Sequence, residues 1–388
     1  MEIPFWVWPQ SVAWVLVHGY LWWRLVRCAM PPGRWRKAAT IALAVMAPTV
    51  PGALIAMHTL SPTEGAWITW PGFIWYGLLV YLLLALVAGE LLRLVLFVAR
   101  KIRRRGAEPE TPEAVASRRR FLARGVAIGA GAVAVTTVGY GMTQAFSSAR
   151  LERITIRLRG LADAGEGFRI ALVADTHVGP FLGRGNISGI VERVNAEKPD
   201  VVVIPGDLID GTVADLGPAV APLGDLRARH GVYFSLGNHE YLFDFDNWVE
   251  YLRDLGIRTL RNERVELPHF DLAGVNDSSG DNVGDPPDYE RALGDRDPDR
   301  PVVLLAHQPA QAYEAQKYGV DLQLSGHTHG GQFFPAGLLT SIGQPVMAGH
   351  GTVGDTQLYV TRGTGFWGPA IRVGSPPEIT LITLAAAR

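Results

Sequence analysis

The sequence predicts an α/β layered domain that follows an α-helical membrane region. The first 150 residues contain four long apolar stretches, whereas short β-type runs alternate with helical or Gly/Pro-rich stretches from Leu151 onward. The charge changes at the same place. Residues 1–150 carry 16 Lys and Arg against 6 Asp and Glu, and residues 151–388 carry 20 against 31. We therefore expect a membrane region at 1–150 and a separate domain at 151–388.

Four apolar stretches in the first region are long enough to cross a bilayer, which takes about 20 residues in a helix. They lie at approximately 5–23, 38–57, 73–95 and 126–147. Pro48 and Pro51 weaken or kink the second stretch. The fourth is built largely from small residues, so a buried soluble helix is its alternative. A cytoplasmic linker is expected at 100–124.

The distribution of Lys and Arg predicts the orientation of these spans. The loop from Arg24 to Lys37 holds five basic residues and the stretch from Arg93 to Arg124 holds ten, whereas the loop from His58 to Trp70 holds none. Basic loops stay in the cytoplasm, so the amino terminus and residues 151–388 are expected outside.

A basic motif before the fourth span supports this orientation. Ser117-Arg118-Arg119-Arg120-Phe121-Leu122 resembles a twin-arginine export signal, S-R-R-x-F-L before a modest apolar stretch. The alternative is a basic anchor that only obeys the positive-inside rule. The resemblance implies the twin-arginine export machinery as a partner. It also implies a multi-pass protein of a bacterial cytoplasmic membrane, with a folded domain on the outer face.

Within residues 151–388, β-type runs at Ile154–Leu158 and Arg169–Ala174 open the domain and Ile379–Leu384 closes it. A helix is expected at Ile187–Glu197, because Pro199 follows it. The single cysteine, Cys28, lies in the membrane region, which excludes disulfides and thiolate metal sites. The acidic balance argues against a nucleic-acid surface, which needs clustered Lys and Arg.

Five polar motifs follow apolar runs in this domain. Strands that end in polar residues bring them to the carboxyl edge of a sheet. Carboxylates, an amide and imidazoles form a mixed N/O set that suits two divalent metals, so a hydrolase with a dinuclear metal centre is expected. The motifs are Asp175-Thr176-His177, Gly206-Asp207-Leu208-Ile209-Asp210, Gly237-Asn238-His239-Glu240, Ala306-His307 and Gly326-His327-Thr328-His329.

The order of these motifs, D-x-H, G-D-x-x-D, G-N-H-E, A-H and G-H-T-H, resembles the calcineurin-like metallophosphoesterase superfamily over residues 165–385. The resemblance implies a four-layer αββα sandwich and a phosphoester substrate. It implies that Asp175, His177 and His329 bind a first metal, that Asn238, His307 and His327 bind a second, and that Asp207 bridges both. It further implies that His239 protonates the leaving group or stabilises the charged phosphorane. Asp210 is expected to orient His239, as a carboxylate that fixes an imidazole tautomer.

Two cations in such a centre lower the pKa of a shared water, and the resulting hydroxide attacks phosphorus in line. The donor set permits Mn²⁺, Fe, Zn or Co, and the resemblance favours Mn²⁺.

Apolar side chains follow several of the motifs and bear on the substrate. Phe181, Phe243, Phe333 and Phe334 are candidates for an apolar rim that accepts acyl chains or touches the bilayer, and Phe366-Trp367 could contribute from a later loop. The alternative is that they pack a small subdomain over the sheet.

The sequences T-R-G-T-G-F-W-G-P at 361–369 and P-P-E-I-T-L-I-T-L at 376–384 follow G-H-T-H-G-G-Q. This ending resembles a bacterial membrane-associated branch of the superfamily, in which some relatives hydrolyse the pyrophosphate of UDP-2,3-diacylglucosamine. Because the domain is expected outside, we favour a phosphodiesterase or phosphatase that acts on a lipid-linked or other envelope phosphoester. The diacylglucosamine pyrophosphatase is the alternative, and an inactive sensor or scaffold is a minor one.

Overall fold

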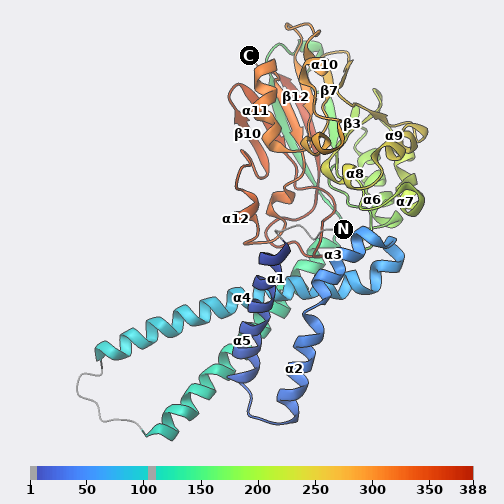
Figure 1. Ribbon diagram of the computed structural model, residues 1–388. Coiled ribbons are helices and arrows are strands. Elements are labelled where there is room, and N and C mark those ends of the chain that lie inside the picture. The colour runs from blue at the N-terminus through green and yellow to red at the C-terminus, as the bar shows by residue number, and fades with distance from the viewer. Residues whose placement is uncertain (1–6, 104–110, 388) are drawn as a thin grey trace. The chain divides into compact units, whose positions relative to one another are not determined.

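The structure is a computed structural model that describes residues 7–103 and 111–387. The chain divides into two compact units. The first contains residues up to His58 together with 67–140, and the second contains 59–66 together with the chain from Gly141 onward. The elements of both units are labelled in Figure 1.

The first unit is helical. Among the residues that the structure describes, three helical stretches are long and apolar enough to cross a membrane. These candidate spans are Arg34–Met57, Pro62–Ala99 and Val115–Ala145. The helices are α1 (Val7–Leu21), a π-helical turn (Trp22–Arg27), α2 (Arg34–Met46), α3 (Thr49–Thr59), α4 (Pro62–Arg103) and α5 (Pro112–Ala145).

The expected spans map onto these helices with some differences. Residues 5 and 6 of the first stretch lie outside the described residues, and the rest of it forms α1 and part of the π-helical turn. The second stretch is divided into α2 and α3 at 47–48, next to Pro48. The third and fourth stretches lie largely within α4 and α5. Of the linker expected at 100–124, residues 104–110 lie outside the described residues, whereas 100–103 and 112–124 are helical.

The second unit contains two six-stranded mixed sheets. The first sheet has the order β1 (Arg150–Leu158), β12 (Glu378–Ala386), β2 (Arg169–Leu172), β3 (Val201–Pro205), β4 (Val232–Ser235) and β5 (Arg258–Thr259). The second has the order β10 (Gly349–Val353), β11 (Thr356–Val360), β9 (Leu322–Ser325), β8 (Val302–Leu305), β7 (Asp271–Gly274) and β6 (Glu263–Glu266).

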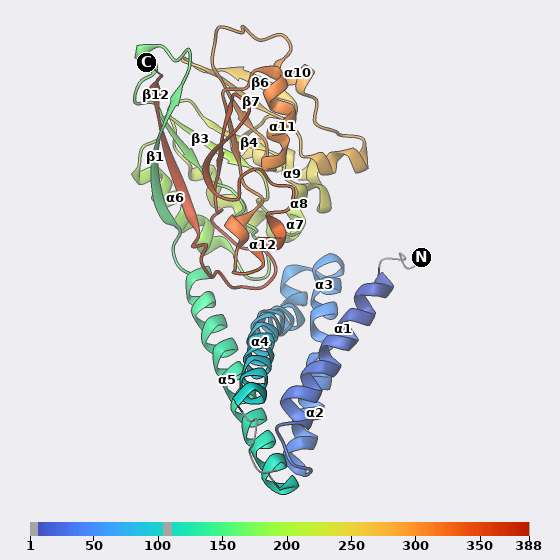
Figure 2. The ribbon, with the colours of Figure 1, turned by 90° about the vertical axis from the view of Figure 1, so that its left-hand side faces the viewer.

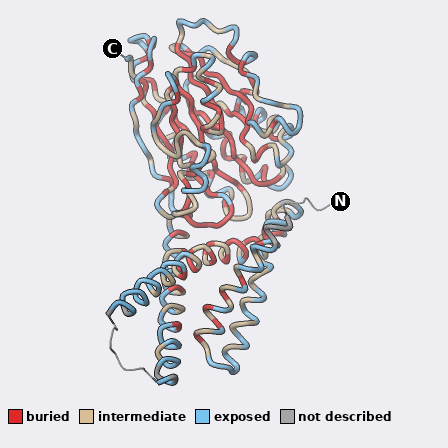
Figure 3. Tube along the Cα trace, turned by 60° about the vertical axis from the view of Figure 1, so that its left-hand side comes forward, coloured by how far each residue is buried: buried red, intermediate tan, exposed pale blue. Residues whose placement is uncertain are grey.

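The two sheets pack face to face because alternate residues of each strand are apolar and buried. In β3, Val201 and Val203 point into the core between the sheets, where they meet residues such as Leu305 and Leu324 of the second sheet. Val202 and Ile204 point to the opposite face. Figure 3 shows that buried residues of this unit concentrate in the strands.

Helices cover the outer face of each sheet, which gives the four-layer αββα sandwich (Figure 2). This arrangement confirms the fold class predicted from the sequence. The helix expected at Ile187–Glu197 is present as α6 (Arg184–Ala196). On the first sheet lie α6 (Arg184–Ala196), α7 (Val213–Val220) and α9 (Phe245–Asp254), and on the second lie α10 (Tyr289–Leu293) and α11 (Ala312–Ala315). Two further short helices are α8 (Asn238–Leu242) and α12 (Gly337–Thr340).

Candidate metal centre

The five polar motifs follow the carboxyl ends of five strands. In the first sheet, β2, β3 and β4 are parallel neighbours and lead into Asp175, Asp207 and Asn238. In the second, β8 and β9 are parallel neighbours and lead into His307 and His327. The nine polar residues expected at the site therefore meet where the two sheets end. Contacts of Asn238, after the first sheet's β4, with His307 and His327, after strands of the second sheet, show this.

The backbone at these motifs adopts a conformation, with positive φ, that residues other than glycine rarely adopt. Positive φ angles occur at Asp175 (52°), His177 (43°), Asp207 (53°), His327 (71°) and His329 (50°). Such strain costs of order 1–3 kcal/mol per residue and concentrates at functional sites. Its clustering at five of the nine predicted residues indicates that the fold holds these side chains in place for a purpose other than stability.

One group of ligand atoms gathers around Asp175, His177 and His329, which lie close enough together to hold a metal ion. The Nε2 atoms of His177 and His329 are 3.1 Å apart, and Nε2 of His329 is 3.9 Å from Oδ1 of Asp175. Asp175 is fully buried, and its Oδ2 finds no hydrogen-bond donor among the described residues. A buried carboxylate oxygen without a donor is costly, so this group fits a bound cation.

A second group gathers around Asp207, His307 and His327. Nε2 of His307 lies 3.1 Å from Oδ2 of Asp207 and 3.1 Å from Oδ1 of Asn238. Nδ1 of His327 lies 2.9 Å from the same Asn238 oxygen. Nδ1 of His307 is 2.8 Å from the carbonyl oxygen of Pro205, and donation of its proton there leaves the Nε2 lone pair free for a metal.

Asp207 lies between the two groups. Its Oδ2 is 3.1 Å from Nε2 of His307 in the second group and 3.7 Å from Nε2 of His177 in the first. Burial alone would raise the pKa of Asp207, but the rings of His307, His239 and His177 together hold it well below its usual range. The side chain is therefore an anion placed within reach of both groups.

His239 and Asp210 form a pair beside the two groups. Nδ1 of His239 is 2.6 Å from Oδ1 of Asp210, and the same oxygen is 3.1 Å from Nδ1 of His177. Asp210 thus contacts two imidazoles, whereas the sequence predicted contact with His239 alone. Burial lowers the pKa of His239, but Asp207 and Asp210 outweigh this effect and raise it to about 9. Asp210 therefore favours the protonated form of this ring.

Two glycines allow the motifs to approach each other this closely. A Cβ on Gly237 would lie 2.4 Å from Oδ1 and 2.5 Å from the backbone nitrogen of Asp207. A Cβ on Gly326 would lie 2.3 Å from Oδ2 of Asp175. A larger residue at either position would collide with a predicted ligand.

Glu240 is the last residue of the third motif, and the sequence predicts no role for it. The structure shows that its buried carboxylate accepts hydrogen bonds from the backbone N–H groups of Gly237 (2.6 Å), Asp207 (3.0 Å) and Leu208 (2.7 Å). It thereby fixes the loop that carries Asp207 against the start of α8.

We expect Glu240→Gln to lower the free energy of unfolding by about 1–3 kcal/mol, because one amide oxygen cannot accept all three bonds and its NH₂ would face a donor. The measurement is the thermal unfolding midpoint of the full chain in detergent. Glu250→Gln, at a side chain that is 67% exposed on α9, is the matched control. Equal midpoints for the two variants would contradict this role.

Arg372 is a second residue for which the sequence motifs gave no signal. It is fully buried, and its guanidinium donates to the carbonyl oxygens of Gly365 (2.9 Å), Ser375 (3.0 Å) and Arg362 (2.8 Å). Its Nη2 also lies 3.1 Å from Nδ1 of His329. Burial, the His177 ring and Arg372 together hold the pKa of His329 well below its ordinary value, which keeps this imidazole neutral.

We expect Arg372→Lys to weaken metal binding by about 10- to 100-fold, the usual effect of removing a group that orients a ligand. Lysine keeps the charge but cannot reproduce the planar fork that binds several carbonyls. The measurement is a metal titration of the full chain, with Arg253→Lys at an exposed side chain as control. If both variants bound metal as the unmodified chain does, Arg372 would have no positioning role.

The aromatic candidates do not behave alike. Phe181 packs against Phe366, with ring centroids 5.8 Å apart, and Phe333 is buried. Phe243 is partly buried against the outer core of the first sheet, and Phe334 is 64% exposed.

Trp367 lies beside the polar site, because its ring centroid is 5.7 Å from that of His239. Its neighbour Phe366 is buried, so the two residues of this dipeptide face different surroundings.

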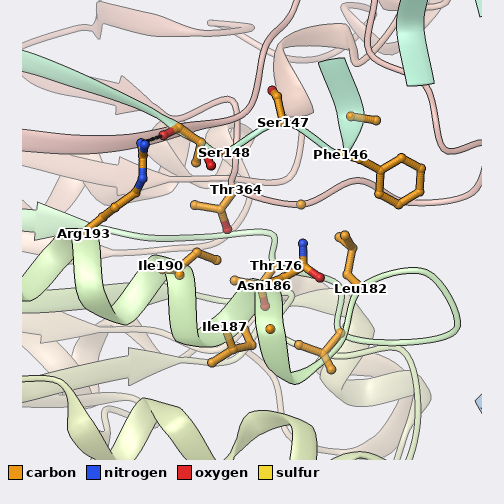
Figure 4. Close-up of a pocket in the computed structure, with 16 residues that line it drawn as sticks. Phe146, Ser147, Ser148, Thr176, Leu182, Asn186, Ile187, Ile190, Arg193 and Thr364 are labelled. Carbon is orange, nitrogen blue, oxygen red and sulfur yellow. Dashed lines mark hydrogen bonds between the residues drawn. The ribbon is translucent and has the colours of Figure 1, made fainter. Parts of the chain in front are cut away.

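A cavity of about 230 Å³ lies behind the first motif, beside Thr176. Figure 4 shows its lining by α6 residues such as Ile187 and Arg193 and by the segment after α5, including Phe146 and Ser147. Thr176 turns away from the ligands and donates to the carbonyl oxygen of Leu208 (2.6 Å), which ties the first motif to the second.

The family model for the calcineurin-like phosphoesterases matches residues 168–331. The chain is 36% identical to a Danio rerio transmembrane protein with metallophosphoesterase domain, across 95% of this chain and 86% of that protein. It is 39% identical to an uncharacterized metallophosphoesterase of Helicobacter pylori, across 56% of this chain and 59% of that protein. A solved structure of phosphopantetheinyl hydrolase from Mycobacterium tuberculosis is 14% identical, with a TM-score of 0.32, across 52% of this chain and 91% of that one.

The similarity to the Danio rerio protein extends over nearly the whole chain, including its membrane-spanning helices. The family match covers all five motifs and the strands that lead into them. The His and Asp side chains of these motifs form clusters that could hold metal ions. The chain therefore belongs to the calcineurin-like metallophosphoesterase superfamily and is a metallophosphoesterase with membrane-spanning helices.

Proposed function

We propose that this chain is a membrane-anchored phosphodiesterase or phosphatase that uses two divalent metals to hydrolyse a lipid-linked or other envelope phosphoester. The observation that carries the proposal is the pair of ligand groups on either side of the buried Asp207 anion, with the His239–Asp210 pair beside them.

In this proposal Asp175, His177 and His329 would hold the first metal, and Asn238, His307 and His327 would hold the second. Asp207 would serve both metals, because its carboxylate lies close to an imidazole of each group. Support comes from the donor chemistry: Asp175 Oδ2 lacks a donor among the described residues, and Pro205 directs the Nε2 lone pair of His307 into the site. Mixed N/O donors suit Mn²⁺, Fe, Zn or Co, and we favour Mn²⁺ for activity.

The two metals would supply charge stabilisation for the phosphoryl oxygens and a water of lowered pKa. His239 donates the proton that the leaving oxygen needs, since Asp210 lies 2.6 Å from its Nδ1 and favours the protonated ring. Asp210 holds the His239 ring and also steadies His177, so one carboxylate positions the proton donor and a metal ligand together.

The proposed domain arrangement is a membrane region at 1–150 with about four spans and a catalytic domain at 151–388 on the outer face of a bacterial cytoplasmic membrane. The basic loops and the motif Ser117–Leu122 support it and suggest export through the twin-arginine machinery.

A topology reporter fused after Arg150 tests this arrangement. We expect activity of a reporter that works only outside the cytoplasm. A cytoplasmic signal would contradict the orientation and would favour the alternative substrate, UDP-2,3-diacylglucosamine, whose nucleotide part is expected inside.

The substrate class is tested with the purified full chain, loaded with Mn²⁺ and offered lipid-linked and water-soluble phosphoesters. We expect hydrolysis that chelation abolishes and added Mn²⁺ restores. If the metal-loaded chain cleaved no phosphoester of either kind, the enzymatic proposal would give way to a sensor or scaffold role.

A further inference from the structure

A short segment after the last metal-ligand motif presents large apolar side chains to the outside of the second unit. Leu338 is 65%, Leu339 75% and Ile342 77% exposed, on and just after α12. Residues 330–349 contain no Asp, Glu, Lys, Arg or His. Leaving aliphatic surface in water costs about 25 cal/mol per Å² relative to burying it. Several exposed aliphatic side chains in one short segment therefore indicate a surface that another molecule or a membrane covers.

The chain around the start of this segment, at residues 332–334, is hydrogen-bonded to Val373. The residue before Val373 is in turn hydrogen-bonded to the end of a candidate membrane span. The backbone N–H of Phe334 donates to the carbonyl oxygen of Val373 (3.0 Å), and the backbone N–H of Val373 donates to the carbonyl oxygen of Gln332 (3.0 Å). The backbone N–H of Arg372 donates to the carbonyl oxygen of Gly141 in α5 (2.9 Å). Gly141 belongs to the candidate span Val115–Ala145 and, with these partners, to the second unit.

This attachment continues just beyond Gly141. Ala145, at the end of α5, packs in one buried cluster with Phe366 and Ala370, and the rings of Phe146 and Phe366 meet edge to face at 5.3 Å. Figure 4 shows Phe146 and Ser147 beside the cavity next to Thr364. The chain at 366–374 therefore holds both the emerging end of a membrane helix and the start of the apolar segment.

We propose that residues 334–342 form a membrane-contact segment whose leucines and isoleucine enter the interfacial region of the bilayer. A helix that leaves the membrane at about residue 145 brings its point of attachment to the lipid surface. Uncharged aliphatic side chains gain most of their stabilisation from burial in lipid and need no polar partner. A folded protein partner would match polar groups at the rim of such a patch.

The segment also bears on access to the metal centre. It starts five residues after His329, and the same 366–374 chain supplies Arg372, which contacts the His329 ring. Insertion of the segment into the bilayer would hold the part of the metal centre around His329 close to the lipid surface. The inference rests on the membrane anchor and not on which phosphoester is cleaved.

The single cysteine allows a direct test with the full chain. In a Cys28→Ser background, Leu339→Cys is labelled with an environment-sensitive nitrobenzoxadiazole dye and reconstituted into phosphatidylcholine/phosphatidylglycerol nanodiscs. Val283→Cys is the matched control, because Val283 is an exposed apolar residue (52%) in a different loop of the same unit.

We expect the dye at Leu339 to emit at shorter wavelength and to be quenched several-fold more strongly by doxyl-labelled lipid than the dye at Val283. Equal quenching of both by aqueous iodide, with no lipid quenching, would overturn the proposal. So would a blue shift at Leu339 without lipid quenching, since protein would then cover the segment. Hydrolysis of a water-soluble phosphoester by both labelled variants checks the fold independently of lipid contact.

Discussion

Replacing Asp207 by Asn is expected to reduce phosphoester hydrolysis by about 10³-fold, the scale seen when one group that organises charge in a transition state is removed. Asp207 is the one anion within 4 Å of imidazoles from both ligand groups, with His307 at 3.1 Å and His177 at 3.7 Å, among the contacts of the described residues. An amide keeps the shape but removes the charge, so repulsion between two metals would go uncompensated.

The measurement for Asp207→Asn combines the steady-state rate with metal analysis of the same sample. We expect the bound metal to fall below that of the unmodified chain together with the rate. Asp225→Asn is the control, since Asp225 is 76% exposed and pairs only loosely with Arg227 (3.7 Å). Full metal content with an unchanged rate in Asp207→Asn would rule out its bridging role.

The second large effect is expected from His239→Gln. Loss of a positioned proton donor lowers kcat by about 10²- to 10⁴-fold for substrates whose leaving group needs a proton. His239 fits that role because Asp210 holds its Nδ1 at 2.6 Å and its pKa is raised to about 9. It is not among the proposed ligands, so the metal content is expected to stay unchanged.

Comparison of two leaving groups separates this role from a general loss of structure. Alkyl esters are expected to show the full decrease, whereas nitrophenyl esters, whose leaving group departs without protonation, are expected to lose much less. An equal loss on both, or a loss of bound metal, would assign His239 to metal binding or folding instead.

The strands that lead into the polar motifs could be predicted from the sequence alone. Apolar runs followed by Asp, Asn or His predicted β2, β3, β4, β8 and β9, and the structure has these strands. The prediction succeeds because buried parallel strands need continuous apolar residues, and polar ligands can follow only where a strand leaves the core. The side chains then meet as a consequence of strand order.

The roles of Glu240 and Arg372 could not be obtained in this way. Glu240 acts on a loop 33 residues earlier, and Arg372 reaches His329 across 43 residues. No regular spacing connects these partners, because the contacts arise only when loops from the two sheets come together. The placement of Trp367 beside His239 has the same origin.

The start of α5 differs from the expectation for a different reason. The sequence predicts a cytoplasmic linker at 100–124, which includes the first residues of this helix. The structure begins the helix at Pro112 with Glu113 in its first turn. Proline at the first helical position and an acidic residue beside it are helix-start signals, so the local sequence did contain the information.

A dinuclear centre that carries out hydrolysis is tested most directly by titrating metal back into the chelated full chain while following both binding and rate. We expect about two equivalents bound per chain and a rate that reaches its maximum only when the second has bound. Full activity with one equivalent, or hydrolysis that persists after complete metal removal, would contradict it.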